Sequence, residues 1–135
     1  MLEVNDLSVA YGKALALHDI NMTVKSGEMV FIVGRNGSGK TTLMKTICGL
    51  LKPQSGNIRF NDNSVGGMPA EVLARQGIGF VAQDKKVFSE LTVASNIDLA
   101  AHAGKRDPKE AVETVVSLYP KMERFLNKKA GSLSG

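Results

Sequence analysis

The chemically active residues of this chain are concentrated in one glycine-rich segment, residues 34–41, which reads GRNGSGKT. The segment follows the spacing G-x-x-x-x-G-K-[ST], in which the glycines let backbone N–H groups turn toward an anion without interference from a Cβ atom. The alternative is a flexible Gly/Ser turn that matches by chance, which is expected in about one per cent or less of chains of this length. The segment therefore predicts a binding site for the phosphates of a nucleotide.

Each residue of this segment has an expected role. Lys40 is expected to reach the β- and γ-phosphates and to act in catalysis, and the Thr41 hydroxyl is expected to ligate Mg²⁺. Thr42, one residue further on, is expected to bond the α-phosphate. The other residues expected to surround the phosphates are Gly34, Asn36, Gly37, Ser38 and Gly39.

Two elements must hold this segment in place. The apolar run at residues 29–33, MVFIV, predicts a strand that is covered on both faces. Beyond the segment, apolar residues recur at helical spacing over residues 40–47, and Gly49 and Pro53 mark the place where that helix should end. A helix that begins here would direct its free N–H groups and the positive end of its dipole toward the phosphates.

Strand and helix patterns interleave in the first part of the chain, and helical patterns follow. The predicted strands lie at residues 2–11, 20–24, 56–60 and 77–83, the first two as an antiparallel pair and the last as a buried strand. The predicted helices lie at residues 68–76, 91–103 and 108–126, with Thr92 and Asp107 as the N-caps of the last two. This order favours an α/β core over residues 1–84 and a helical region over residues 85–135.

Four motifs, in this order along the chain, resemble those of the ATP-binding cassette (ABC) ATPases. Tyr11 in VAYG resembles their adenine-stacking aromatic residue, and GRNGSGKTT resembles their Walker A motif. Gln83 in FVAQDKKVFSELTVASNI resembles the Q-loop glutamine, and Leu133-Ser134-Gly135 resembles the start of the LSGGQ signature. Taken singly, Tyr11 would be an ordinary strand-end tyrosine, Gln83 an ordinary polar residue after a strand, and Leu-Ser-Gly a common tripeptide.

The resemblance implies a fold and a set of ligands. The implied fold class is α/β: the P-loop NTPase core of an ABC nucleotide-binding domain, with an N-terminal antiparallel β-subdomain and the start of the α-helical subdomain, and incomplete. ATP and Mg²⁺ are the implied cofactors, with Tyr11 stacked on adenine and Gln83 close to the metal and the attacking water in a catalytic role. Ser134 and Gly135 are implied to meet the γ-phosphate that a second ABC ATPase subunit holds.

The resemblance also implies transport. The segments KKVFSELTV and LYPKMERFLNKKAGSLSG are similar to the ATPases of branched-chain amino-acid and urea importers. The complete protein is thus expected to couple MgATP binding and hydrolysis to the uptake of branched-chain amino acids or a similar small polar solute. Transmembrane permease subunits are the implied partners, contacted through the region after Gln83.

The family motifs that follow the signature, including the Walker B Asp-Glu pair, are absent from these 135 residues. Without that pair the site lacks a metal partner and a general base, so the isolated chain is expected to be an inactive N-terminal part of an ATPase. The alternatives are a nucleotide-binding fragment without turnover and a soluble, non-transport ABC ATPase.

Charge and composition narrow the partners and the location. The chain has 17 basic and 13 acidic residues and 5% aromatic residues, without a block of five like charges, so no nucleic-acid partner is expected. Its longest apolar run is too short for a membrane span, and its start lacks the features of a signal peptide. The single cysteine, Cys48, fits a reducing compartment. These features predict a cytoplasmic protein, and the resemblance implies that it is peripheral at the inner face of the cell membrane.

Several other residues are expected to be structural. His18 and His102 have no Cys, Asp or Glu at metal-ligand spacing, which indicates surface or packing positions. Cys48 is expected to be a small core residue on the helix after the glycine-rich segment. The apolar residues Val112, Val115, Val116 and Leu118 are expected to pack against a core.

Overall fold

A computed structural model describes residues 1–83 and 87–133 of the chain. The chain divides into two compact units, a first unit Met1–Phe80 and a second unit Val81–Gly135. The predicted boundary between residues 84 and 85 lies outside the described residues. None of the helices in the described ranges is long and apolar enough to cross a membrane.

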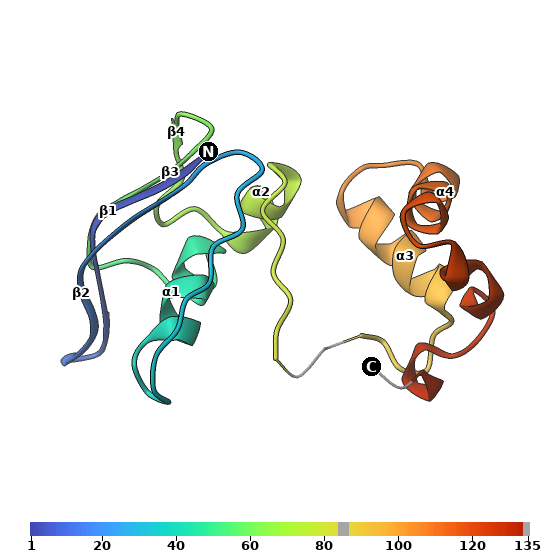
Figure 1. The fold of residues 1–135 in the computed structure, drawn as a ribbon, viewed down its shortest axis with the longest axis horizontal. Helices are drawn as coiled ribbons and strands as arrows, with labels where there is room; N and C mark the ends of the chain where they lie inside the picture. The colour runs from blue at the N-terminus through green and yellow to red at the C-terminus, as the bar shows by residue number, and fades with distance from the viewer. Residues whose placement is uncertain (84–86, 134–135) are drawn as a thin grey trace. The chain divides into compact units, whose positions relative to one another are not determined.

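The first unit is built on an antiparallel sheet with the strand order β2-β1-β3-β4 (Figure 1). Its strands are β1 (Leu2–Tyr11), β2 (Ala14–Val24), β3 (Ser55–Phe60) and β4 (Asn63–Ser64). The predicted antiparallel pair is confirmed, and the turn between β1 and β2 uses Gly12 at φ 60, a conformation that glycine adopts without steric cost. The predicted third strand is confirmed as β3, whereas β4 was not predicted.

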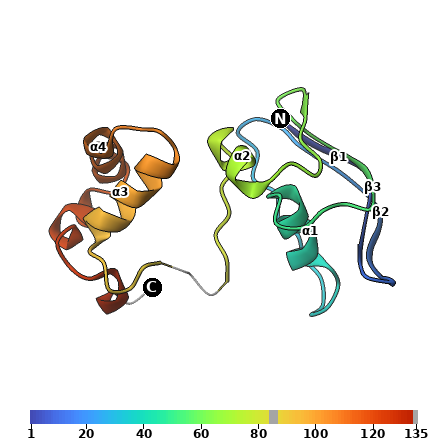
Figure 2. The same ribbon diagram turned by 180° about the vertical axis from the view of Figure 1, so that it is seen from behind.

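Two helices cover one face of this sheet, as both views of the ribbon show (Figures 1 and 2). They are α1 (Lys40–Ile47) and α2 (Ala70–Arg75), and both were predicted. The core between helices and sheet consists of Val4, Leu7, Val9, Leu17, Leu43, Ile47, Ile58, Val65 and Leu73. Burial of these side chains is the main favourable term in the stability of this unit.

Two of the predicted strands are wrong. Residues 29–33 and 77–83 form no strand, and several of their apolar side chains are exposed, with Val33 at 88% and Val81 at 86%. A strand exists through the hydrogen bonds that it makes with a neighbouring strand. Within residues 1–83 and 87–133, neither segment is paired with another strand. An apolar run alone was therefore not sufficient evidence for a strand, because it did not show which strand would pair with it.

The second unit is helical. It contains α3 (Val93–Ala103), α4 (Pro108–Leu118) and the short 3₁₀ helices η1 (Pro120–Phe125) and η2 (Ala130–Ser132). Both predicted N-caps are confirmed: the Thr92 hydroxyl accepts the Ser95 N–H at 3.0 Å, and the Asp107 carboxylate accepts the Lys109 N–H at 2.8 Å.

The last predicted helix is shorter than expected. It ends at Leu118 and not at residue 126, because a residue before proline disfavours helical backbone, and Tyr119 before Pro120 has φ −139 and ψ 80. The expected packing of its apolar face is also wrong in part. No residue of α4 is fully buried, and Leu118 is 80% exposed.

Main-chain hydrogen bonds join the segment before α3 to the segment near η2. The Ala130 N–H donates to the Leu91 carbonyl at 2.9 Å, and the Gly131 N–H donates to the Ser89 carbonyl at 3.0 Å. A Cβ atom at Gly131 would lie only 2.7 Å from the Ser89 Cβ, so glycine permits this close approach. These bonds connect the segment that precedes α3 to the segment that follows α4.

A candidate phosphate-binding loop

The candidate site is the loop of residues 34–39, which leads directly into α1. The Ser38 N–H donates to the Arg35 carbonyl at 3.2 Å and closes a turn within the loop. Gly37 has φ 83 and Gly39 has φ 89, in the region of backbone conformation that glycine adopts most readily. The sequence pattern thus folds into a turn immediately before a helix N-terminus.

The start of α1 presents backbone donors without a side-chain cap. The first helical bond runs from the Leu43 N–H to the Gly39 carbonyl at 2.9 Å, so the amides of Lys40, Thr41 and Thr42 precede it. Gly39 is the N-cap residue and supplies no capping side chain. Uncapped amides at the positive end of a helix dipole suit an anionic ligand such as phosphate.

Lys40 folds back over this loop. Its ammonium donates to the Gly34 carbonyl at 2.6 Å and to the Arg35 carbonyl at 2.8 Å, and its Nζ lies 3.5 Å from the Ser38 hydroxyl. The positive charge is therefore held within the loop by neutral acceptors. Phosphate oxygens are stronger acceptors for an ammonium than carbonyl groups are, so this arrangement fits an anion at the loop.

Two glycines of the loop allow close contacts. A Cβ atom at Gly34 would lie 2.7 Å from the Ser38 hydroxyl oxygen, and one at Gly39 would lie 2.5 Å from a methyl carbon of Leu17. The buried Leu17 side chain of β2 thus packs against the loop backbone at Gly39, where α1 begins. Sequence reasoning did not identify Leu17, although its apolar position in an alternating strand was a signal for burial.

Tyr11 and Thr42 come together at the end of β1. The hydroxyl groups of the two residues lie 3.4 Å apart, and Tyr11 is 52% exposed. The tyrosine ring is thus beside α1, with much of its surface open. Stacking of this ring on adenine stays a prediction.

The other predicted site residues, Gln83, Ser134 and Gly135, belong to the second unit. Gln83 is exposed and belongs to the second unit, so its approach to Thr41 stays a prediction. Ser134 and Gly135 lie outside the described residues. Among the described residues, no group of three or more His, Cys, Asp and Glu side chains could hold a metal ion. Thr41, at the start of α1, can offer Mg²⁺ one hydroxyl oxygen, and phosphate oxygens suit the remaining ligand positions.

The residues expected to be structural include one buried thiol. Cys48 is buried at the end of α1, as predicted, and this burial raises the pKa of the Cys48 thiol. His18 and His102 have exposed side chains beside Asp19 and Asp98, which confirms their assignment to the surface. None of these residues contributes to the loop.

A groove of about 530 Å³ lies in the second unit, away from the loop in sequence. It is formed by the first turns of α3 and α4 and is lined by Ala94, Ser95, Asp98, Pro108, Lys109, Val112 and Glu113. This groove contains none of the residues of the candidate site. The candidate site is identified by the chemistry of the loop, because an uncapped helix start and an ammonium converge there.

Proteins of known sequence or structure resemble this chain over its whole length. The family described as ABC transporter matches residues 17–135. The chain is 37% identical to the high-affinity branched-chain amino acid transport ATP-binding protein BraG of Pseudomonas aeruginosa, over 100% of this chain and 58% of BraG. The chain thus spans less than two thirds of the length of this relative.

Two solved structures have the same fold over the described chain. MJ1267, an ATP-binding cassette of an ABC transporter, has a TM-score of 0.86 at 27% identity, over 100% of this chain and 59% of that chain. The ATP-binding cassette MJ0796, in a dimeric post-hydrolysis state bound to ADP and Pi, has a TM-score of 0.78 at 30% identity, over 99% of this chain and 63% of that chain.

Proposed function

The chain belongs to the ABC transporter family, and from this premise we propose that it binds MgATP as the ATP-binding part of an importer. The predicted fold class is confirmed, as an ABC cassette fold with an antiparallel β-subdomain and helices that is partial relative to full cassettes. The proposal rests on the loop of residues 34–39. This loop leads into the start of α1, which has no side-chain cap, and the Lys40 ammonium donates a hydrogen bond to the carbonyl of Gly34 in the same loop.

In this proposal the chain binds the phosphates with its backbone and with one charge. The amides of the first turn of α1 donate to phosphate oxygens, and glycines at positions 34, 37 and 39 keep Cβ atoms out of the loop. Lys40 exchanges its carbonyl acceptors on Gly34 and Arg35 for oxygens of the β- and γ-phosphates. The exchange strengthens its hydrogen bonds because the new acceptors are charged.

Thr41 holds the metal in this proposal, and Gln83 approaches it from the second unit. Bound Mg²⁺ would neutralise developing charge on the phosphates. Tyr11 stacks on adenine with the exposed part of its ring, and the Thr42 hydroxyl lies beside the α-phosphate. Stacking gives affinity without reading hydrogen-bonding groups of the base.

We assign the transport role from the relatives. BraG is a branched-chain amino acid transport protein by name, which supports uptake of branched-chain amino acids or a similar small polar solute. Dimeric MJ0796 supports pairing with a second ATPase subunit, to which Ser134 and Gly135 would present the start of a signature. Transmembrane permeases at the inner face of the cell membrane are the further partners that this role requires.

The 135-residue chain by itself is proposed to hydrolyse ATP no faster than background. The contacts described at the loop come from Lys40, Ser38 and Leu17, and none of these is a carboxylate that could act as a general base. Loss of a general base typically lowers the rate by about 10²- to 10⁴-fold.

The test compares two lysines of the same helix. Lys40→Ala should weaken MgATP binding at least about ten-fold, because a charge-assisted hydrogen bond contributes about 1.5–3 kcal/mol. Lys45→Ala removes a lysine from the last turn of α1 and should change the dissociation constant less than two-fold. Isothermal titration calorimetry, with and without Mg²⁺, measures both. Equal affinities for the two variants, in protein with unchanged circular dichroism, would disprove phosphate binding at this loop.

A further inference from the structure

The hairpin of β1 and β2 contains bulges in opposite strands. The strand pairs on either side of them are Val4–Met22, Leu7–Ile20 and Val9–Leu17. An extra residue therefore lies on β1 in the first interval and on β2 in the second, so the two bulges offset one another, and a further shift follows between Val9 and Ala10. An aspartate in the left-handed backbone region lies in each interval, Asp6 at φ 49 and Asp19 at φ 47.

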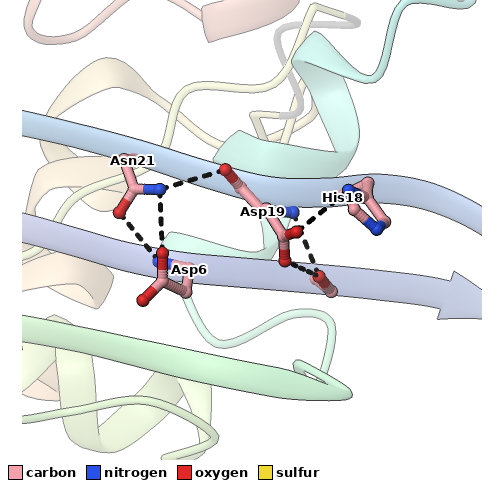
Figure 3. A network of polar contacts seen from close by, with 5 residues as sticks. Asp6, His18, Asp19 and Asn21 are labelled. Atoms are coloured by element: carbon pink, nitrogen blue, oxygen red, sulfur yellow. Dashed lines mark hydrogen bonds and ion pairs between the residues drawn. The ribbon is translucent and has the colours of Figure 1, made fainter.

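Two side chains hold these bulges together (Figure 3). The Asn21 side-chain amide donates to the Asp6 carboxylate at 3.0 Å and to the Asp19 carbonyl at 3.1 Å, and its oxygen accepts the Asp6 N–H at 2.9 Å. The buried Ser8 hydroxyl accepts the Asp19 N–H at 3.1 Å. His18 lies outside this pair of contacts, with its Nδ1 3.2 Å from the Asp19 carboxylate. Backbone N–H and carbonyl groups at the bulges thus have side-chain hydrogen-bond partners in place of partners on the neighbouring strand.

The bulges change which face of the sheet the following residues take. Val4 and Leu7 are three residues apart, yet both are buried in the same core. In a regular strand, side chains three residues apart would lie on opposite faces of the sheet. The orientation of everything beyond Val9 is therefore set by the irregular part of the hairpin and not by a simple count from its start.

The hairpin end beyond the bulges contacts α1 and the loop of residues 34–39. Tyr11 reaches Thr42 with its hydroxyl, and Leu17 lies against Gly39. A shift of one residue in strand register moves each side chain to the opposite face of the sheet. Such a shift would turn Tyr11 away from α1.

We propose that the paired bulges at Asp6 and Asp19, held by Asn21 and Ser8, position the nucleotide base by fixing the hairpin register that places Tyr11 beside the phosphate loop. The proposal rests on the proposed function, in which Tyr11 stacks on the base. Asp19 and Asn21 act as positioning residues, since the contacts described for them lie within the hairpin.

The test separates base binding from phosphate binding in the 135-residue chain. Asp19→Gly keeps the left-handed backbone at the bulge, whereas Asp19→Val favours a regular strand, because a β-branched residue is strongly disfavoured at positive φ. Calorimetry with Mg²⁺ compares ATP with inorganic tripolyphosphate for both variants. We expect Asp19→Val to weaken ATP at least about five-fold more than it weakens tripolyphosphate, because loss of base stacking affects ATP alone, whereas displacement of Leu17 from the loop affects both ligands. Asp19→Gly should bind both ligands as the parent does.

Tyr11→Ala in the same series identifies which assignment fails. If Tyr11→Ala weakens ATP binding but Asp19→Val binds ATP with the same affinity as Asp19→Gly, the bulges do not position the base and the proposal is wrong. If Tyr11→Ala leaves ATP affinity unchanged, the base assignment and this proposal fall together, while phosphate binding stands on Lys40. Should Asp19→Val not fold, Asn21→Ala keeps both aspartates and gives the same contrast. Equal weakening of ATP and tripolyphosphate by Asn21→Ala, or no weakening, would overturn the proposal.

Discussion

The two units of this chain are each stabilised internally by a different kind of interaction. The first unit encloses an apolar core contributed by β1, β2, β3, α1 and α2, with Leu7 and Ile58 among its fully buried members. In the described part of the second unit, Ala101 is the buried apolar residue, and α4 has none. Its segments are joined by helix caps, by the Asn96 side chain and by main-chain hydrogen bonds between the flanks of α3 and α4.

This difference predicts different modes of unfolding. Apolar burial is non-directional and shared among many contacts, so a core tends to be lost as a whole. A hydrogen bond contributes about 0.5–1.5 kcal/mol and depends on its own geometry, so a unit built from such bonds opens locally. The phosphate loop is attached to the cooperative unit, through α1 and Leu17. We therefore expect slow hydrogen exchange around the loop helix and faster exchange in the second unit.

The largest expected effect comes from a cavity in the first unit. Leu7→Ala should lower the free energy of unfolding by about 2–5 kcal/mol, because it removes a fully buried side chain and leaves a cavity. Leu118→Ala is the matched control, since Leu118 is exposed on α4, and it should have little effect. Urea unfolding followed by amide exchange in β1 and β3 measures both. Similar losses for the two leucines would contradict the contrast between the units.

The next effect is removal of the Asn96 side chain in the second unit. This side chain accepts the Phe88 N–H at 2.9 Å and donates to the Phe88 and Thr92 carbonyls at 3.0 and 2.9 Å. Asn96→Ala should cost about 1–2 kcal/mol locally and speed exchange of the Phe88 amide, with β1 unchanged. Asn127→Ala, at an exposed position, is the control. Faster exchange throughout both units, or no change at Phe88, would rule out a local role.

A smaller effect is expected at the start of α4. The Asp107 carboxylate accepts the N–H groups of Lys109 and Glu110 at 2.8 and 3.1 Å. Asp107→Ala should destabilise α4 by about 0.5–2 kcal/mol, and Asp107→Asn, which keeps an oxygen acceptor, should restore most of this loss. Helical content and exchange of the α4 amides provide the measurement. An alanine variant as stable as the asparagine variant would show that the cap contributes nothing here.

The smallest effect concerns the buried thiol of the first unit. Burial raises the pKa of Cys48 above its ordinary value of 9.0, so the folded unit keeps the thiol protonated where the unfolded chain would lose the proton. The resulting contribution to stability is complete below pH 9 and is lost as the pH rises through the raised pKa. Cys48→Ala should therefore flatten the alkaline fall in unfolding free energy. Parallel pH profiles for parent and variant above pH 9 would refute this linkage.

Local signals in the sequence predicted much of this fold. Thr92 and Asp107 were identified as helix caps because a cap depends on a few adjacent residues. The helix after the loop and the pairing of β1 with β2 were predicted for the same reason, from spacing and turn residues. For the site, the pattern at residues 34–41 indicated the loop and its chemistry, but not the carbonyl contacts of Lys40 or the support from Leu17.

The failures depended on partners that are distant in sequence. The run at residues 29–33 has the composition of a buried strand, yet composition cannot state which backbone pairs with it. The bulges at Asp6 and Asp19 also escaped prediction, because alternation is read on the assumption of a regular strand. A signal was present in the residue types: aspartate and asparagine tolerate positive φ, and four of them, Asn5, Asp6, Asp19 and Asn21, lie within the first two strands near the irregular register.

The contact between Leu17 and Gly39 joins a core residue to a residue of the candidate phosphate-binding loop without any polar group between them. Efforts to stabilise this protein by repacking its interior would commonly begin at side chains such as Leu17. A bulkier or differently branched side chain there would press on the backbone of the loop, where glycine has no side chain to yield. Under the proposed function, thermal stability and affinity for phosphate are therefore not independent engineering targets at this position, and selection for either one constrains the other.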